Sequence, residues 1–381
     1  MSVRVTHVVH DLHGGGFESL IATMAGRLAG TPVALSVISL SGREGRVGAA
    51  VRPLLDQYHV LQPGSSWSML VPVALTRAIR ATRADVVHLH SGVWYKGALA
   101  ARRAGVGGVV YTEHGREHSD PRLMRLLDRV ASRRTDFVVA VSDRLAGYLA
   151  GAVGVRPDAI VTIRNGVDTD RFAPGAAPDA LRRALGIPDG ALVVGSIGRL
   201  APVKAYERLI EAVARLRAMD VGRPVRGVIW GDGDQRPALE AKVRESGLVD
   251  IVHLPGWTET PVLAHRLLDV FALTSHSEGT SVSLLESLAC GAAPVVMDVG
   301  ANADILGPEL AGQVVPAGDV AGFVAVLAAT LRDPERRRCA AQAGRASVVA
   351  RYSFDAMMAA YRRLYEDLAA RGRGVERRAA L

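Results

Sequence analysis

The feature that most constrains this fold is the regular alternation of short apolar runs with longer amphipathic stretches along the chain of 381 residues. Short apolar runs are typical of buried parallel strands, and the stretches between them have the length and periodicity of helices. Such an alternation predicts βαβ units that build a mostly parallel sheet, and therefore an α/β fold. We expect the first strands at residues 3–10, 33–40, 85–90, 108–112, 137–141 and 160–163.

The strand series then starts again. Residues 172–178, between the two series, are rich in Pro, Gly and Ala and have the composition of a linker. A chain of this length is also more than one core usually organises. The sequence therefore predicts two doubly wound α/β domains, 1–172 and 173–352, followed by a helical segment with a basic tail, 353–381. The second set of strands is expected at residues 192–197, 225–230, 251–254, 270–274 and 293–297.

Composition excludes several classes of protein. With 49% hydrophobic and 22% charged residues, the chain is neither disordered nor fibrous. The two cysteines, Cys290 and Cys339, cannot build a disulfide framework, and the first ten residues lack the apolar core of a signal peptide. The sequence has no run of about 18 apolar residues that would span a membrane. We therefore expect a cytoplasmic protein.

The formal charge of +8 is unevenly distributed. Residues 1–186 contain 23 Lys and Arg against 15 Asp and Glu, whereas residues 187–381 contain 23 of each. The excess predicts an anionic partner for the first domain, either a phosphorylated acceptor or an acidic lipid surface. The alternative is that the 43 Arg against three Lys reflect only a GC-rich genome. Nucleic acid is disfavoured, because no basic run alternates with stacking aromatic residues.

The loop at residues 11–18, DLHGGGFE, follows the first expected strand and opens a helix. Its glycines would let backbone amides approach an anion at the positive end of the helix dipole. The dinucleotide fingerprint would need a third glycine where Ser19 stands, and no acidic residue follows the second strand, so NAD is disfavoured. A glycine turn that only lets the helix pack closely explains this loop equally well.

A second candidate site follows the first strand of the second domain. Arg199 and Lys204 lie in the loop GRLAPVK, at the carboxyl end of a parallel strand, where open α/β sheets bind ligands. Two cations at this spacing can bind a diphosphate without a metal ion. The chain has only three lysines, which favours a specific role for the compact ammonium of Lys204 over a solvated surface pair.

The most specific candidate is the stretch SEGTSVSLLESLACG at residues 277–291. Glu278 lies in the loop after a strand, and Glu286 lies about one turn into the next helix. Both carboxylates can face one ligand, with the amides of residues 279–282 between them. A carboxylate accepts two hydrogen bonds from a vicinal diol, so Glu286 could hold a ribose and Glu278 a sugar hydroxyl. Helix-capping glutamates would explain either residue singly, but not the pair.

These motifs, together with His114 in TEHGRE and with IRNGVD at residues 163–168, occur in the order seen in retaining glycosyltransferases of family four, and the chain resembles that family over about residues 3–365. The resemblance implies the B-type fold, in which two Rossmann-like domains face each other. The second domain would hold the donor, the first would hold the acceptor, and the final helix would cross back to the first.

The resemblance also implies roles for individual residues. Arg199 and Lys204 would neutralise the departing diphosphate, Glu286 would bind the ribose, and Glu278 would hold the transferred sugar. His114 would contact that sugar at the reacting face. The remaining donor-binding residues would be Gly15 and Gly16 against the phosphates, and the amides of Gly279, Thr280, Ser281 and Val282.

The reaction implied is the transfer of a hexosyl unit from a nucleotide sugar, expected to be a UDP-hexose. A phosphate oxygen of the leaving group would accept the acceptor's proton, so neither an enzymic nucleophile nor a metal or other cofactor is expected. This agrees with a sequence in which we find no Ser/His/Asp arrangement and no metal-ligand cluster. The acceptor would be a sugar, a glycolipid or polysaccharide precursor, or a small natural product.

Two departures from the family pattern put the donor sugar in doubt: Asp304 stands where glutamate is usual, and Ala301 where a second glycine is commoner. Three alternatives stay open: a nucleotide-sugar epimerase of the same fold, a relative of the phosphorylases, and a binding protein without turnover. The phosphorylase is disfavoured because none of the three lysines lies in a pyridoxal motif.

Three further features have ordinary explanations. Residues 122–134 place leucines beside arginines on a helix that could lie on an anionic membrane, although we expect its leucines to pack on the sheet. His88 and His90 share one face of a strand, where we expect packing, because no third metal ligand has a suitable spacing. Trp67 and Met69 would contact an apolar acceptor, although packing is the commoner role of Trp.

Overall fold

The computed structural model describes residues 2–13, 16–64, 69–115, 121–176 and 178–379. It divides into two compact units. Unit 1 comprises Met1–Arg164 together with Met357–Leu381, and unit 2 comprises Asn165–Ala356. The predicted boundary at 172/173 therefore falls inside unit 2, because Val167 pairs with Ser353 and Phe172 is buried in the unit 2 core.

Unit 1 is built on a seven-stranded sheet in the order β3-β2-β1-β4-β5-β6-β7. All neighbouring strands are parallel. The strands are β1 (Val3–Val9), β2 (Val33–Ser39), β3 (Gln57–Val60), β4 (Val86–His90), β5 (Gly108–Glu113), β6 (Phe137–Ala140) and β7 (Ile160–Thr162). The helices are α1 (Gly16–Leu28), α2 (Arg46–Val51), α3 (Val73–Thr82), α4 (Trp94–Ala104), α5 (Arg122–Ser132) and α6 (Asp143–Tyr148), and the unit also takes most of α15 (Phe354–Ala379).

Unit 2 repeats this plan with six parallel strands in the order β10-β9-β8-β11-β12-β13. The strands are β8 (Leu192–Ile197), β9 (Val225–Trp230), β10 (Val252–Gly256), β11 (Val270–Leu273), β12 (Ala293–Met297) and β13 (Val314–Val315). The helices are α7 (Asp179–Ala184), α8 (Tyr206–Arg217), α9 (Arg236–Glu245), α10 (Pro261–Arg266), α11 (Val282–Cys290), α12 (Asn302–Leu306), α13 (Val320–Arg332) and α14 (Pro334–Arg351). Each sheet is therefore doubly wound, and its strand order reverses at β1/β4 in unit 1 and at β8/β11 in unit 2.

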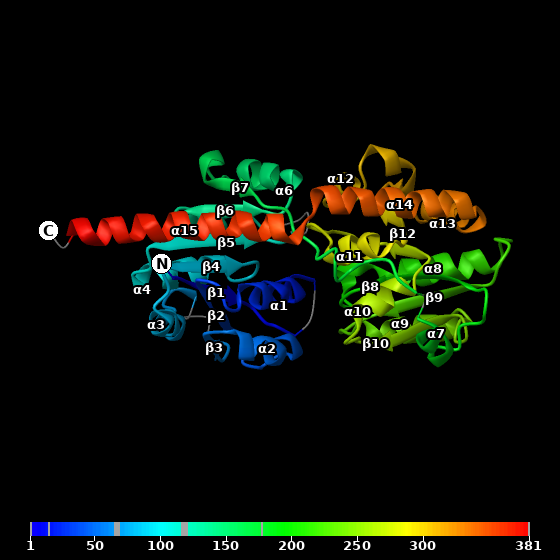
Figure 1. Cartoon of the computed structure of the whole chain (residues 1–381), viewed down its shortest axis with the longest axis horizontal. Coiled ribbons are helices and arrows are strands. Elements are labelled where there is room, and N and C mark those ends of the chain that lie inside the picture. The colour runs from blue at the N-terminus through cyan, green and yellow to red at the C-terminus, as the bar shows by residue number, and fades with distance from the viewer. Residues whose placement is uncertain (1, 14–15, 65–68, 116–120, 177, 380–381) are drawn as a thin grey trace. The chain divides into compact units, whose positions relative to one another are not determined.

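Helix α15 follows unit 2 in sequence but packs on the sheet of unit 1. Figure 1 shows this helix, in red, running along β5 and β6. A side chain at Gly108 on β5 would lie 2.9 Å from the Cβ atom of Leu368 on α15, so the strand and the helix are in close contact. The buried hydroxyl groups of Tyr361 and Tyr365 also reach the sheet from this helix.

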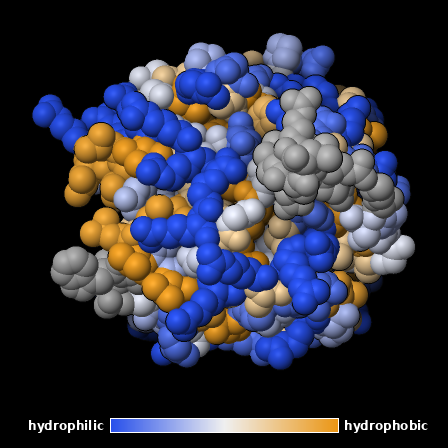
Figure 2. All heavy atoms as spheres, turned by 90° about the vertical axis from the view of Figure 1, so that its left-hand side faces the viewer, coloured by the Kyte–Doolittle hydropathy of each residue, from blue (hydrophilic) through white to orange (hydrophobic). Residues whose placement is uncertain are grey.

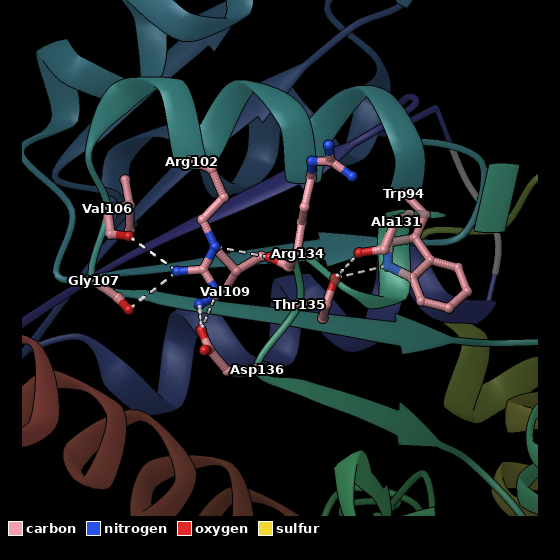
Figure 3. Close-up of polar contacts among 9 residues, drawn as sticks. All are labelled: Trp94, Arg102, Val106, Gly107, Val109, Ala131, Arg134, Thr135 and Asp136. Atoms are coloured by element: carbon pink, nitrogen blue, oxygen red, sulfur yellow. Dashed lines mark hydrogen bonds and ion pairs between the residues drawn. The ribbon is translucent and has the colours of Figure 1, made fainter. Parts of the chain in front are cut away.

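A single arginine fastens α4 to the two strands beneath it (Figure 3). The Arg102 guanidinium donates to the carbonyl oxygen of Arg134 at 2.9 Å and to Asp136 Oδ2 at 2.8 Å. The same carboxylate oxygen accepts from the backbone N–H of Val109 at 2.7 Å. Nearby, Trp94 Nε1 donates to Thr135 Oγ1 at 3.0 Å. These bonds fix the start of β5 and of β6.

Helix α5 differs from expectation. Two of its leucines face solvent instead of the sheet: Leu123 and Leu126 are 65% and 56% exposed, whereas Asp128 and Ala131 are buried. The helix lies beside α4, and its small Ala131 side chain is the one that faces the core. An apolar stripe is therefore left on the surface. In the part of the chain that the structure describes, every helix is too short or too polar to traverse a lipid bilayer.

Candidate functional site

Lys204 and Glu278 meet in unit 2 at the point where the strand order reverses. Lys204 ends the short 3₁₀ turn Pro202–Lys204 after β8, and Glu278 lies in the loop after the neighbouring strand β11. Lys204 Nζ lies 2.7 Å from Glu278 Oε1, which also accepts from Ser275 Oγ at 2.6 Å. The side chains are 20% and 8% exposed, so this ion pair is partly withdrawn from water. The structure therefore brings together two of the predicted residues.

The backbone around Lys204 is strained, and hydrogen bonds from the residues after β11 hold it in place. Ala205 has a φ of 48°, in the left-handed region that residues with a Cβ atom rarely adopt. Its carbonyl oxygen accepts from Thr274 Oγ1 at 3.0 Å, and the N–H of His276 donates to the carbonyl oxygen of Val203 at 2.8 Å. The end of β11 thus fixes the segment that aims Lys204.

The loop that carries Arg199 rests directly on two glycines after β9. A Cβ atom at Gly231 would lie 1.9 Å from the Gly198 carbonyl oxygen, and one at Gly233 would lie 2.4 Å from that of Leu200. Arg199 itself is exposed. Among the described residues its guanidinium has no hydrogen-bond or ion-pair partner, so it is available to an anion at this edge of the sheet.

The predicted amides lie at the start of helix α11. Ser281 is its N-cap, and Ser281 Oγ accepts from the N–H of Leu284. The loop before it is fastened by the Thr280 carbonyl oxygen, which accepts from Asn165 Nδ2 at 3.1 Å, and by that of Gly279, which accepts from the N–H of Ala301 at 2.9 Å. The amides of residues 279–282 thus stand at a positive helix end that begins about one turn before Glu286.

Glu286 has a partner that the sequence did not reveal. His265, a fully buried residue of α10, has its Nε2 atom 3.1 Å from Glu286 Oε2 and its Nδ1 atom 2.6 Å from Ser287 Oγ. The imidazole therefore holds the carboxylate in one orientation. Nothing in the spacing of the sequence links residue 265 to residue 286, because the contact depends on how α10 packs on α11.

In unit 1, His114 follows β5. Its backbone N–H donates to Ser91 Oγ at 2.9 Å, and Ser91 in turn donates to Glu113 Oε1 at 2.7 Å. The ring of Phe17 lies 4.5 Å from the ring of His114, between centroids. Gly16, the first residue of α1, is exposed. Gly15 and Trp67 lie outside the described residues.

Three buried histidines lie next to His114, and one of them was missed. His7 on β1 is the parallel partner of His88 on β4, and His90 is two residues further along the same face. Their ring nitrogens include atoms that all lie within 4.8 Å of one another. The expectation that no third possible metal ligand accompanies His88 and His90 was therefore wrong. Recognising His7 required the strand order, which places β1 beside β4.

Cys290 has no features of an activated nucleophile. It is buried in the unit 2 core, and burial raises the pKa of its thiol to about 12. The thiolate that would attack a substrate is therefore essentially absent at neutral pH.

Two family models match the chain. Residues 14–171 match Glycosyltransferase Family 4, and residues 178–347 match Glycosyl transferases group 1. The 2-deoxystreptamine glucosyltransferase of Streptomyces kanamyceticus is 30% identical over 294 residues, which cover 71% of this chain and 75% of that enzyme. The chain belongs to the family 4, group 1 glycosyltransferases. The expected enzyme class, a hexosyltransferase, is thereby confirmed.

Other relatives of this glycosyltransferase agree. The D-inositol 3-phosphate glycosyltransferase of Saccharomonospora viridis is 31% identical over 276 residues, 66% of this chain and 63% of that protein. The crystal structure of Anabaena Alr3699/HepE in complex with UDP and glucose has a TM-score of 0.81 at 19% identity, covering 97% of this chain and all of that one. The expected fold, two Rossmann-like domains of the glycosyltransferase B type, is confirmed.

Proposed function

We propose that this glycosyltransferase is a retaining, metal-independent enzyme that moves a hexosyl unit from a nucleotide sugar, a UDP-hexose, to an acceptor hydroxyl. The observation that carries the proposal is the pairing of Lys204 with Glu278 at the strand-order reversal of unit 2, where open α/β sheets bind ligands. The crystal structure of HepE in complex with UDP and glucose supports the choice of donor.

The donor diphosphate would lie where positive groups converge within unit 2. Lys204 supplies an ammonium, Arg199 an exposed guanidinium, and the start of α11 a set of backbone amides. In the unliganded site Glu278 balances Lys204. When the diphosphate binds, it takes over that ammonium and frees Glu278 to accept a hydrogen bond from a hydroxyl of the sugar. These positive groups would neutralise the leaving diphosphate, a role that a divalent metal ion has in other transferases.

Glu286 would hold the nucleotide ribose. Its Oε2 atom is held by His265, and its side chain is 16% exposed, so one face of the carboxylate remains open. A carboxylate fixed in this way can accept from both hydroxyls of a vicinal diol.

Retention would follow from attack on the face that the leaving group departs from. The acceptor oxygen bonds to the anomeric carbon as the bond from that carbon to the phosphate oxygen breaks, and the acceptor proton passes to an oxygen of the leaving diphosphate. The high pKa of Cys290 supports a route without this thiol as covalent nucleophile. We assign His114 to the sugar at the reacting face.

The acceptor side of the proposal rests on the surface of unit 1. Leu123, Met124 and Leu126 on α5 are exposed beside Arg122 and Arg129. An exposed apolar stripe flanked by arginines is the pattern of a helix that lies in an anionic membrane interface. Figure 2 shows exposed apolar side chains gathered along one edge of a largely hydrophilic face. We propose peripheral binding at the inner face of the cell membrane, and a glycolipid or polysaccharide precursor as acceptor.

A transfer assay with UDP- and GDP-hexoses tests the proposal. The acceptors are a lipid-linked sugar, 2-deoxystreptamine and D-inositol 3-phosphate, the last two taken from the names of the relatives. We expect transfer from a UDP-hexose in the presence of EDTA, with the anomeric configuration of the donor preserved in the NMR spectrum of the product. An inverted product, or activity that EDTA abolishes and Mg²⁺ restores, would contradict the mechanism.

A further inference from the structure

A continuous chain of side-chain hydrogen bonds runs through the core of unit 1 and ends at His114. His114 Nε2 lies 2.9 Å from His90 Nδ1, and His90 Nε2 lies 3.1 Å from His7 Nδ1. The next member is Tyr365 on α15, whose hydroxyl oxygen lies 3.2 Å from His7 Nε2. An unbroken series of hydrogen bonds thus connects the final helix to His114.

Beyond Tyr365 the chain returns to the sheet. The Tyr365 hydroxyl oxygen lies 2.6 Å from His88 Nδ1, and His88 Nε2 lies 2.7 Å from Thr112 Oγ1. The last contact joins Thr112 Oγ1 to the hydroxyl oxygen of Tyr361 at 3.2 Å. Tyr361 and Tyr365 are one helical turn apart on α15, so one face of this helix closes the chain at both points.

The four imidazoles are neutral at physiological pH. Burial, with the charge of His114 as a second cause, lowers the pKa of His7 to about 3, and burial lowers that of His114 to about 3. The pKa values of His88 and His90 are also lowered well below the usual value, first by burial and then by the neighbouring histidines. Burial raises the pKa of Tyr361 to about 12 and raises that of Tyr365 well above its usual value, so both phenols keep their protons.

Neutral rings give the chain a direction. Each neutral imidazole donates through one nitrogen and accepts through the other, so placing one proton places all of them. If Tyr361 donates to Thr112 and Thr112 to His88, every buried proton from Tyr361 to His90 finds an acceptor. In the reverse direction the hydroxyl proton of Tyr361 has no acceptor among the described residues. The reverse direction thus leaves two buried groups without a partner in the described part of the chain, the Tyr361 proton and the lone pair of His114 Nδ1. The first direction leaves only the Nδ1–H of His114 without one, so it is favoured, and it puts the proton of His114 on Nδ1.

The Nδ1 atom of His114 is the open end of the chain. It is buried and, within the described part of the chain, has no hydrogen-bond partner. A buried N–H without an acceptor costs free energy that a ligand oxygen can recover. We propose that the chain fixes His114 as its Nδ1–H tautomer, which donates to an oxygen of the transferred sugar, and that Tyr365 is the positioning residue that transmits this direction. Only the identity of the ligand oxygen rests on the proposed function.

The same three histidines could be read as a metal site, because their nitrogens are close enough to share an ion. In the direction derived above, however, the lone pairs of His7, His88 and His90 already accept hydrogen bonds from Tyr365, Thr112 and His7. A metal ion would have to break the chain at each of these links. The chain includes every hydrogen bond that the three rings make to one another, to Thr112 and to Tyr365.

NMR of protein labelled with ¹⁵N-histidine tests the assignment directly, because the two ring nitrogens of each tautomer have distinct shifts. The wild-type spectrum should show His114, identified by its loss in His114→Asn, as the Nδ1–H form. In Tyr365→Phe we expect His7 and His114 to become mixtures of both tautomers. The matched control is Tyr361→Phe, which removes a buried hydroxyl from the same helix but only from the end of the chain. Thr112 can still donate to His88 in this variant, so His114 should stay unchanged.

Kinetics supply the second readout. Tyr365→Phe should lower kcat about tenfold more than Tyr361→Phe does, with little change in the KM for the donor. Because an asparagine amide can place an N–H near the position of Nδ1, His114→Asn should retain at least tenfold more activity than His114→Gln. An Nε2–H tautomer in the wild type, equal kcat for the two phenylalanine variants, or one equivalent of bound zinc or iron in the purified protein would each overturn the proposal. The NMR result stands even if no nucleotide sugar proves to be a donor.

Discussion

The ammonium of Lys204 lies 2.7 Å from the carboxylate of Glu278, although 74 residues separate them. The pair forms because β8 and β11 are neighbours and the chain leaves both strands at the same edge of the sheet. A bound diphosphate would replace the carboxylate as the partner of the ammonium. The unliganded pairing therefore keeps the cation in place for the donor.

Substitution Lys204→Ala should remove most of the rise in melting temperature that UDP produces in the wild type. Ligand binding stabilises the folded state by an amount that grows with the logarithm of the affinity, and a charge-assisted contact to the diphosphate is lost. The measurement is a thermal shift titration with UDP. Lys242→Ala, which removes a lysine from α9 in the same unit, is the control and should keep the full shift. An undiminished UDP shift in Lys204→Ala would count against the donor site.

Glu286 should account for the preference of the enzyme for a ribose over a 2′-deoxyribose. Wild type is expected to bind UDP at least tenfold more tightly than 2′-deoxy-UDP, whereas Glu286→Ala should bind both with similar, weaker affinity, because the acceptor of the diol is gone. Isothermal titration calorimetry measures both constants. His265→Ala should show part of the same loss and His265→Gln less of it, since glutamine can still donate to the carboxylate. Equal discrimination in all these variants would place the ribose elsewhere.

Gly231→Ala should unfold unit 2 or displace the Arg199 loop. The added Cβ atom would lie 1.9 Å from the Gly198 carbonyl oxygen, so we expect a loss of more than about 3 kcal/mol in the free energy of unfolding. Gly247→Ala is the matched control: its φ is also positive, at 64°, but the new Cβ atom would meet nothing within 4 Å. It should cost only about 1 kcal/mol. Urea denaturation compares the two, and equal losses would show that contact with the loop is unimportant.

The free energy of unfolding should fall as the pH is lowered from 7 to 5. The folded-state pKa of His7 is about 3 and the unfolded value about 6.5, so the unfolded chain binds more protons in this range, and stability is lost as the pH falls. Each such histidine contributes up to about 1.4 kcal/mol per pH unit. Urea titrations at both pH values measure the slope. It should decrease in His88→Gln and stay unchanged in His10→Gln, where an exposed histidine is lost; identical slopes would refute this account.

Membrane binding can be tested with vesicles. Wild type should cosediment with vesicles that contain phosphatidylglycerol and less with pure phosphatidylcholine, and salt should weaken the binding. The double change Leu123→Asp and Leu126→Asp should abolish it. Val249→Asp, at another exposed apolar position (59% exposed), is the control and should bind normally. Normal binding by the α5 variant would exclude this helix as the contact.

Much of the fold could be predicted because buried parallel strands are apolar on both faces. The expected strands agree with β1, β2, β4 to β12 to within two residues at each end. Two edge strands, β3 and β13, were missed because they lack such an apolar run. β3 reads Gln57–Val60 and is only partly buried, and β13 has two residues, so neither forms an apolar run long enough to stand out.

The site could be predicted only where one segment carries the chemistry. Glu278, Glu286 and the amides between them lie in one loop and helix, and sequence spacing is enough to place them together. The partners of these residues come from elsewhere: His265 reaches Glu286 from α10, and His7 reaches His90 from another strand. Such pairings depend on strand order and helix packing, which local patterns do not encode.

The position of α15 has a consequence for biosynthesis. Tyr361 and Tyr365 seal the sheet of unit 1, yet a ribosome makes them only after it has made all of unit 2. A nascent chain that ends before α15 would leave the polar side chains of His7 and His88 without the phenol that joins them. Unit 2 is one continuous segment, Asn165–Ala356, and can fold as soon as that segment has left the ribosome. Unit 1 can complete its fold only after α15 has also been synthesised.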